Sequence, residues 1–181
     1  MRPQVYKEEG IVLQRREVGE ADRILTVLTK SLGTLKVLAK GVKRPKSKKR
    51  GALEVFTHIK FSAVKLNGID LMTEVEALES FSSFRKDIKK IALAYFFCEV
   101  VLKLTHPEEK NVQLFLLLLE NLKKLRSESK LKTMRFTFAR EALVILGFWP
   151  EQKELVDPDR TLQEISERKI NTLRVGFQML Q

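Results

Sequence analysis

Cysteine is almost missing from this sequence, which has one, Cys98, among 181 residues. A single cysteine forms no internal disulfide and cannot supply a thiolate metal cluster. Cys98 lies in the apolar stretch 95–101, where a free cysteine is usually a small core residue rather than a reactive thiol. This cysteine usage favours a cytoplasmic location.

Histidine is nearly as scarce, and the two present, His58 and His106, lie in different predicted domains. We expect His58 on a solvent-facing strand position and His106 in a turn between helices. Neither has acids or cysteines at the spacing of a metal site, and the glycines are scattered singly, so no phosphate-binding loop is formed. The sequence therefore predicts a protein that is not an enzyme and that uses no metal or cofactor.

Long apolar runs are also missing. The run of leucines and phenylalanine at residues 114–119, for example, is far too short to cross a bilayer. The first residues lack the apolar core of a signal peptide, because Lys7, Glu8 and Glu9 follow at once. We therefore expect no contact with membranes.

Acidic residues are missing from one stretch in particular, residues 40–50. This stretch reads Lys-Gly-Val-Lys-Arg-Pro-Lys-Ser-Lys-Lys-Arg and contains seven cations. Gly41 and Pro45 interrupt any regular element, so the charge lies on a loop. The net charge is +11, and these seven cations account for most of it. Dense, unopposed cations are typical of nucleic-acid binders, although a merely solubilising loop is the alternative.

The first 80 residues are predicted to form five strands, because apolar residues alternate there with polar ones. Ser31–Gly33 and Asn67–Gly68 have the composition of hairpin turns. The strands are expected around residues 11–13, 24–28, 35–40, 56–63 and 71–77. Five strands in a small unit favour the OB-fold, a partly open barrel, over an SH3-like barrel or a small sandwich.

From Ser82 onward the apolar period changes to that of helices. Three helices are predicted, with Ser83 as the N-cap of the first and Gly147 at the end of the third. Glu108 and Glu109 are expected in the first turn of the second helix. A capping box, Thr161 with Glu164, predicts a short fourth helix. The predicted class is α+β, with an OB-fold domain over residues 1–80 and an α-helical domain over residues 81–181.

The candidate nucleic-acid site consists of cations that would neutralise phosphates. In the basic loop these are Lys40, Lys43, Arg44, Lys46, Lys48, Lys49 and Arg50. Arg15, Arg16 and Lys36 extend the predicted path across the barrel. Only Tyr6, Phe56 and Phe61 offer rings for base stacking, so we expect charge to dominate and binding to tolerate any base sequence.

Two other interpretations stay open from the residues alone. A basic loop on a barrel does not distinguish DNA from RNA, so an RNA-binding or ribosome-associated OB-fold protein is the alternative. The helical domain also allows a protein-interaction module for which nucleic acid is secondary.

The order of these features resembles the RecO family of bacterial recombination mediators. The resemblance rests on short segments along the first 150 residues. They are Glu9–Leu13, Gly19–Ile24, Thr29 with Gly33, Ala39–Ser47, Gly51–Leu53, Phe56–Thr57, and Leu146–Phe148 with Pro150. It implies an N-terminal OB-fold and a C-terminal helical domain that bind single- and double-stranded DNA and anneal complementary strands. It also implies partners, namely RecR, single-strand-binding protein, RecA and RecF.

The sequence departs from that family at one point. Many members carry a four-cysteine zinc site after the third helix, and this sequence has no cysteine there. We therefore expect no zinc, and we expect the terminal part of the helical domain to be reduced.

Overall fold

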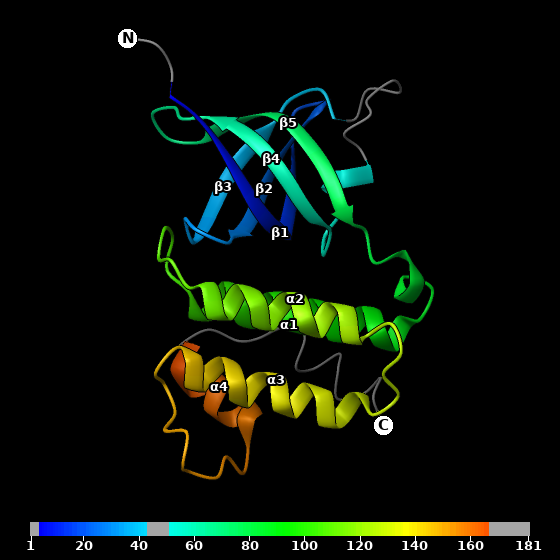
Figure 1. Ribbon diagram of the computed structural model, residues 1–181, viewed down its shortest axis with the longest axis vertical. Coiled ribbons are helices and arrows are strands. Elements are labelled where there is room, and N and C mark those ends of the chain that lie inside the picture. The colour runs from blue at the N-terminus through cyan, green and yellow to red at the C-terminus, as the bar shows by residue number, and fades with distance from the viewer. Residues whose placement is uncertain (1–3, 43–50, 167–181) are drawn as a thin grey trace. The chain divides into compact units, whose positions relative to one another are not determined.

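The computed structural model describes residues 4–42 and 51–166 of the chain (Figure 1). The fold divides into two compact units. The first takes in residues 1–80 together with 106–115, and the second takes in residues 81–105 and 116–181. Residues 106–115 thus belong to the β-unit, although the sequence pattern placed them in the helical domain. Each unit is described by itself below.

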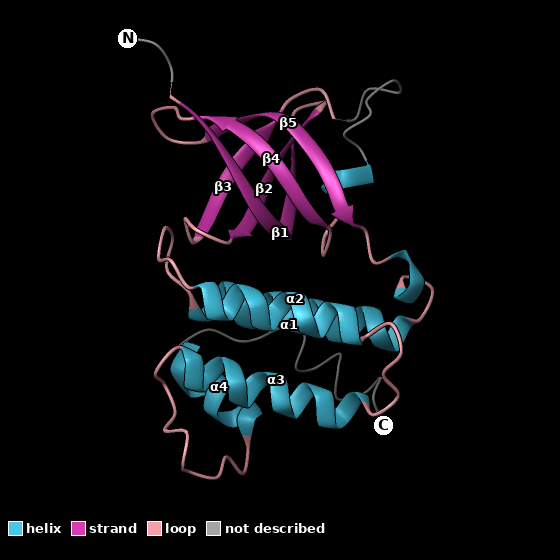
Figure 2. Cartoon of the chain, viewed as in Figure 1, coloured by secondary structure: helices cyan, strands magenta, loops and turns pink. Residues whose placement is uncertain are grey.

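The first unit is a closed barrel with the strand order β1-β2-β3-β5-β4 (Figure 2). All pairs are antiparallel except β3 with β5, which is parallel. This order, closed by the pairing of β1 with β4, confirms the OB-fold prediction. The strands are β1 Val5–Val18, β2 Asp22–Thr29, β3 Thr34–Ala39, β4 His58–Val64 and β5 Asp70–Glu79.

The interior of the barrel is filled by side chains from all five strands. Most of them are aliphatic, and they alternate with outward residues as a pleated strand requires. The buried cluster consists of Val12, Leu25, Val27, Val37, Ala39, Val42, Leu53, Ile59, Phe61, Ala63 and Met72. On β5 the interior residues are Met72 and the partly buried Val75. The pairing of β4 with β5 shifts register between Ser62 and Ala63, which disturbs the simple alternation of inward and outward residues.

Two hairpin turns follow the sequence prediction. Gly33 adopts a left-handed φ of 73°, and its carbonyl accepts a hydrogen bond from the Thr29 hydroxyl at 2.7 Å. After β4, the Asp70 carboxylate accepts from the Leu66 N–H at 3.0 Å and from the Tyr6 hydroxyl at 2.7 Å. Burial, and then the bond to Asp70, raise the pKa of Tyr6 well above its usual value. The phenol therefore stays protonated and ties β1 to the β4–β5 hairpin.

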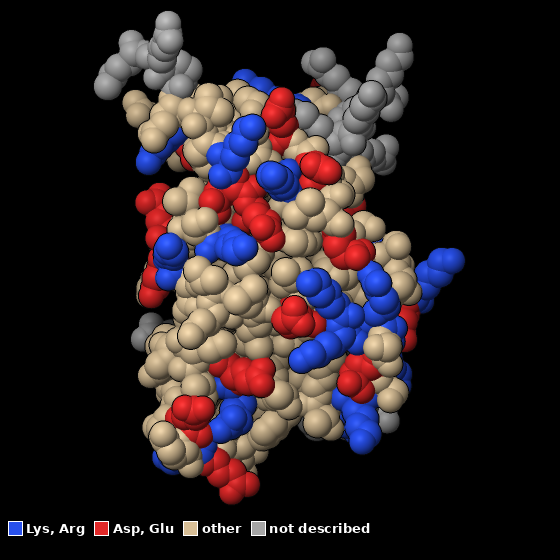
Figure 3. Space-filling view, viewed as in Figure 1, with Lys and Arg blue, Asp and Glu red and all other residues tan. Residues whose placement is uncertain are grey.

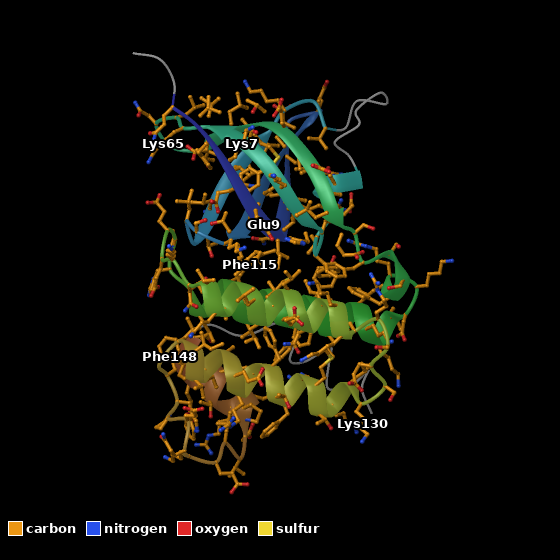
Figure 4. All side chains as sticks on the ribbon, viewed as in Figure 1. Lys7, Glu9, Lys65, Phe115, Lys130 and Phe148 are labelled. Atoms are coloured by element: carbon orange, nitrogen blue, oxygen red, sulfur yellow. The ribbon has the colours of Figure 1, made fainter. Side chains whose placement is uncertain are left out.

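The prediction that His58 faces solvent is wrong. His58 is only 8% exposed, and its Nε2 lies 2.8 Å from the Glu9 carboxylate. Its ring also packs edge-on against Phe115 at a centroid distance of 6.0 Å (Glu9 and Phe115 are labelled in Figure 4). Strand alternation alone cannot reveal this burial, because the covering residue belongs to the distant segment 106–115.

The second unit is built on helices, as predicted. They are α1 Ile88–Leu104, α2 Val112–Lys124, α3 Leu131–Ile145 and α4 Pro158–Ser166, and α2 belongs to this unit from residue 116 onward. Phe97 of α1 and Phe138 of α3 are both fully buried, with ring centroids 4.2 Å apart. Cys98 beside them is 1% exposed, and burial raises the pKa of its thiol far above the usual range. The thiol is therefore an unreactive core group, in line with its apolar neighbours in the sequence.

The predicted helix starts are wrong at α1 and α2. Asp87, rather than Ser83, caps α1, because its carboxylate accepts from the N–H groups of Lys89 and Lys90. Ser83 lies in a short 3₁₀ turn before it. Asn111 accepts from the Leu114 N–H at the start of α2, so Glu108 and Glu109 precede that helix. Serine and aspartate are both common N-cap residues, so the sequence cannot tell which of the two caps the helix. Only the path of the backbone decides it.

The predicted capping box of α4 is also wrong. The helix begins earlier, at Pro158, and Asp157 accepts the Arg160 N–H at 3.0 Å. Thr161 donates its hydroxyl to the Asp157 carbonyl, while Glu164 pairs with Arg160 at 2.8 Å. Proline suits the first position of a helix, which places the start ahead of the threonine.

A partly buried ion pair fastens α4 to α3. The Arg135 guanidinium makes a two-point contact with Asp159, at 2.7 and 2.8 Å. The same guanidinium lies 4.2 Å from the centre of the Phe96 ring on α1. One side chain therefore links three helices through charge and ring contact.

No helix in the described part of the chain is long and apolar enough to cross a membrane. Within residues 4–42 and 51–166, no group of three or more His, Cys, Asp or Glu side chains is arranged to hold a metal ion.

Candidate nucleic-acid interface

Most of the predicted site lies outside the described residues. This applies to Lys43, Arg44, Lys46, Lys48, Lys49 and Arg50. The structure places the other four, Lys40, Arg15, Arg16 and Lys36, on the barrel, where all four are exposed. The site is therefore built here from the residues that frame the basic segment.

Both ends of the basic segment are fixed in the barrel. Val42 on one side and Leu53 on the other are fully buried in the barrel core. The Gly41 N–H also donates to the Asp22 carboxylate at 2.8 Å, next to the β1–β2 turn. The barrel core therefore holds the chain directly before residue 43 and shortly after residue 50.

Strand alternation sends the adjacent Arg15 and Arg16 to opposite faces, and a bulge in β1 decides which of the two faces inward. Before the bulge, the inward-facing Val12 pairs with Val27 of β2, and after it Arg15 pairs with Leu25. Directly opposed residues point to the same face, so Arg15 projects on the inner side at the end of the barrel. Arg16 therefore projects to the outer face. The two side chains do not form one continuous path.

Arg15 is engaged by an acid that sequence reasoning overlooked. Glu54 forms an ion pair with Arg15 and a second one, at 3.3 Å, with Arg23. The Arg23 side chain is only 6% exposed, and its other nitrogen lies 3.9 Å from Glu17. Arg23, a cation directly before the predicted apolar strand 24–28, was the sequence signal for this network. Because Glu54 already neutralises the Arg15 guanidinium, a phosphate has to displace Glu54 to pair with it.

Arg16 and Lys36 share the outer face of β1, β2 and β3. Arg16 of β1 lies opposite Ile24 of β2. Lys36 of β3 lies opposite Thr26, which is two residues further along β2 and so points to the same outer face. Neither cation has an ion pair with another described residue. The surface around strands 2 and 3 is where OB-folds bind oligonucleotides. These two cations therefore stay candidates for phosphate contact.

The aromatic residues of the barrel are poorly placed for stacking on bases. Phe56 and Phe61 are each only 2% exposed. Tyr6 is partly buried, bonded to Asp70 and packed edge-on against Phe61. A base needs a free ring face, which none of these three side chains offers. Charge is therefore the main attraction that this barrel can exert on a nucleic acid.

Replacing Glu54 tests whether that acid competes with phosphate for Arg15. We expect Glu54→Gln to steepen the log–log salt dependence of single-strand binding by about 0.7, the contribution of one extra phosphate. The same change should lower the free energy of unfolding by about 1–3 kcal/mol, because the buried Arg23 loses its nearest carboxylate. Salt titrations of oligonucleotide binding and urea unfolding measure the two effects.

Glu76→Gln is the matched control for that prediction. Glu76 is exposed on β5 and has no ion pair among the described residues, so its loss raises net charge by the same amount. Equal binding by the two variants would show that Glu54 acts only through net charge.

The chain matches one protein family along both units. Residues 1–81 match the family described as recombination protein O N terminal, and residues 85–166 match recombination protein O C terminal. Curated relatives with the name DNA repair protein RecO are similar over most of the chain. The relative from Dehalococcoides mccartyi (strain 195) is 32% identical over 153 residues, 84% of this chain and 60% of that protein.

Two further relatives are somewhat more similar. The protein from Pelotomaculum thermopropionicum is 35% identical over 81% of this chain and 57% of its own length. The protein from Desulforudis audaxviator is 37% identical over 81% of this chain and 58% of its own length. The chain spans about 60% of the length of the curated relatives it matches. With both family segments matched in order on a five-stranded barrel and a helical unit, the chain belongs to the RecO family.

Proposed function

We propose that this chain is a non-catalytic DNA-binding mediator of recombinational repair, which acts in the cytoplasm. It binds single- and double-stranded DNA through the basic segment 40–50 and anneals complementary strands. It also works with RecR to help load RecA on strands coated by single-strand-binding protein, with RecF as a further candidate partner.

One observation carries this proposal. The chain belongs to a family of recombination and repair proteins, and its OB-fold barrel buries Val42 and Leu53, which lie on either side of the six cations in residues 43–50. Lys40 is exposed at the start of the basic segment, and Arg16 and Lys36 are exposed on the outer face of the barrel. A concentrated positive surface without free aromatic rings suits the phosphate backbone, which every DNA strand shares.

Strand annealing is the most direct test. We expect the chain to accelerate pairing of complementary single strands, both when they are bare and when they are coated with single-strand-binding protein. The cause is neutralisation of phosphate charge on two strands that otherwise repel each other. Fluorescence quenching between labelled complementary strands follows the rate, with a non-complementary pair as the control.

Two results would contradict the proposal. Annealing of bare strands that stops once single-strand-binding protein is present would deny the mediator role. Preferential binding of structured RNA over both single-stranded and duplex DNA would favour the RNA-binding or ribosome-associated alternative.

A further inference from the structure

The helical unit carries a cationic surface that the proposed function does not use. It lies where the N-terminal ends of α1 and α3 meet the C-terminal end of α2. Figure 3 shows Lys and Arg side chains gathered over these helix ends. We name it the helix-end surface, and its members are Lys86, Lys89, Lys90, Lys123, Lys124, Arg126, Lys130 and Lys132.

Contacts within the unit bring these three segments together. The Lys90 ammonium on α1 donates to the Arg126 carbonyl beyond α2, at 3.2 Å. The Glu128 carboxylate accepts from the N–H groups of Lys130 and Ser129, at 2.6 and 2.8 Å. These two backbone bonds, helped by the nearby charges of Lys130 and Lys90, lower the pKa of Glu128. The start of α1 therefore lies beside the end of α2, and the start of α3 follows a few residues later in the chain.

The few carboxylates at this surface are already occupied. Asp87 caps α1, and Glu128 accepts from the two N–H groups before α3. Glu120 lies 3.7 Å from Lys123, in a pair one turn apart on α2. Three carboxylates face eight cations, so the surface keeps a strong positive charge.

Three of the lysines oppose the preference of their own helices. The first turns of α1 and α3 contain no acid, and they carry Lys89, Lys90 and Lys132 instead. The helix dipole places partial positive charge at the N-terminus of a helix. A cation there is therefore unfavourable, while a bound anion is favourable. Lys123 and Lys124 differ, because a helix C-terminus stabilises cations. Helix stability therefore accounts for the α2 lysines but not for Lys89, Lys90 and Lys132.

The shape of the surface favours a nucleic acid over an acidic peptide. Its charges are mostly lysine ammonium groups spread over three helix ends, and lysines neutralise phosphates as point charges. A peptide partner is usually held by an apolar anchor in a pocket. A pocket of about 330 Å³ with polar and apolar lining, which includes Phe136 and Leu155, lies elsewhere, between α3 and the segment that follows it. In Figure 4, Lys130 and Phe148 mark the opposite ends of α3.

We propose that the helix-end surface is a second binding site for the phosphate backbone of nucleic acids, located on the helical unit. The proposal rests on the proposed function, which brings the protein to DNA. A molecule with one phosphate site on each unit binds two strands at once. This gives annealing a physical route, because each strand is neutralised on its own surface.

The test uses the full chain with Lys89→Glu and Lys132→Glu combined. The log–log salt slope of binding to a single-stranded oligonucleotide should flatten by about 1.4, at roughly 0.7 for each lost phosphate contact. Folding should be maintained, because each glutamate enters the first turn of a helix, where acids are stabilising. Thermal unfolding measures that point separately.

Arg140→Glu with Lys153→Glu is the matched control. Both residues line the cavity after α3, and the change in charge is the same. We expect this control to bind oligonucleotides with a steeper salt slope than the helix-end variant. Equal slopes for the two variants would show an effect of net charge only and would overturn the proposal.

A second arm separates this proposal from the function proposed for the barrel. In a chain with Lys46, Lys48, Lys49 and Arg50 changed to Ala, residual binding should persist and should disappear when Lys89→Glu and Lys132→Glu are added. No further loss on that addition would overturn the helix-end site and leave the barrel site intact. Loss of binding to an oligo-glutamate probe, with unchanged oligonucleotide binding, would identify an acidic protein partner and overturn the proposal as well.

Discussion

Changing Lys46, Lys48, Lys49 and Arg50 to Ala is expected to flatten the salt dependence of single-strand binding by about 2 to 3 units on the log–log scale. Each phosphate neutralised on a single strand contributes about 0.7 to that slope. The loss should be nearly the same for any base sequence, because phosphate contacts carry no sequence information. Oligonucleotides of different composition, titrated over a range of salt, measure both points.

The control for this variant changes four cations elsewhere in the β-unit to Ala. They are Lys7, Lys60, Lys65 and Lys110, all of them exposed. If the basic segment is only a solubilising loop, the two quadruple variants will bind alike, with the same slope. A loop variant that folds normally and binds with the salt dependence of the unchanged protein would move the site away from residues 40–50.

Gly33→Ala is expected to lower the free energy of unfolding of the barrel by about 2–4 kcal/mol. Gly33 has a left-handed φ of 73°, which costs energy for any residue with a Cβ. A Cβ there would also lie 2.5 Å from the backbone oxygen of Glu109, in residues 106–115, which follow α1 and belong to the β-unit. Backbone atoms cannot rotate aside as a side chain can. Urea unfolding followed by circular dichroism measures the loss.

Gly19→Ala separates the two causes. Gly19 also has a left-handed φ, 57°, but nothing lies within 4 Å of the added Cβ. It should therefore lose only the conformational part, about 1 kcal/mol. If both variants lose the same stability, the close approach of Glu109 does not contribute.

The helical unit shows why some boundaries could be predicted and others could not. Apolar periodicity locates α1, α2 and α3 because a helix must bury one stripe of side chains. The caps depend on single hydrogen bonds, and several residues before each helix could make them. Asp87 rather than Ser83 caps α1 because the chain first forms a 3₁₀ turn at residues 82–84.

The sequence by itself determined the barrel, the helices and the place where positive charge is concentrated. Strand alternation, helical period and turn residues act over a few neighbours, so they can be read along the chain. The sequence also shows whether the residue types that a given kind of site needs are present. A single cysteine cannot supply the four thiolates of a four-cysteine site, whatever the fold.

Only the tertiary structure decided which charges act together. One bulge in β1 shifts the strand by one residue, so Arg15 meets Glu54 and Arg23 while Arg16 faces outward. Lys90 meets the carbonyl of Arg126 only because two helix ends lie side by side. Such contacts join residues tens of positions apart, and their partners are fixed by packing rather than by local pattern.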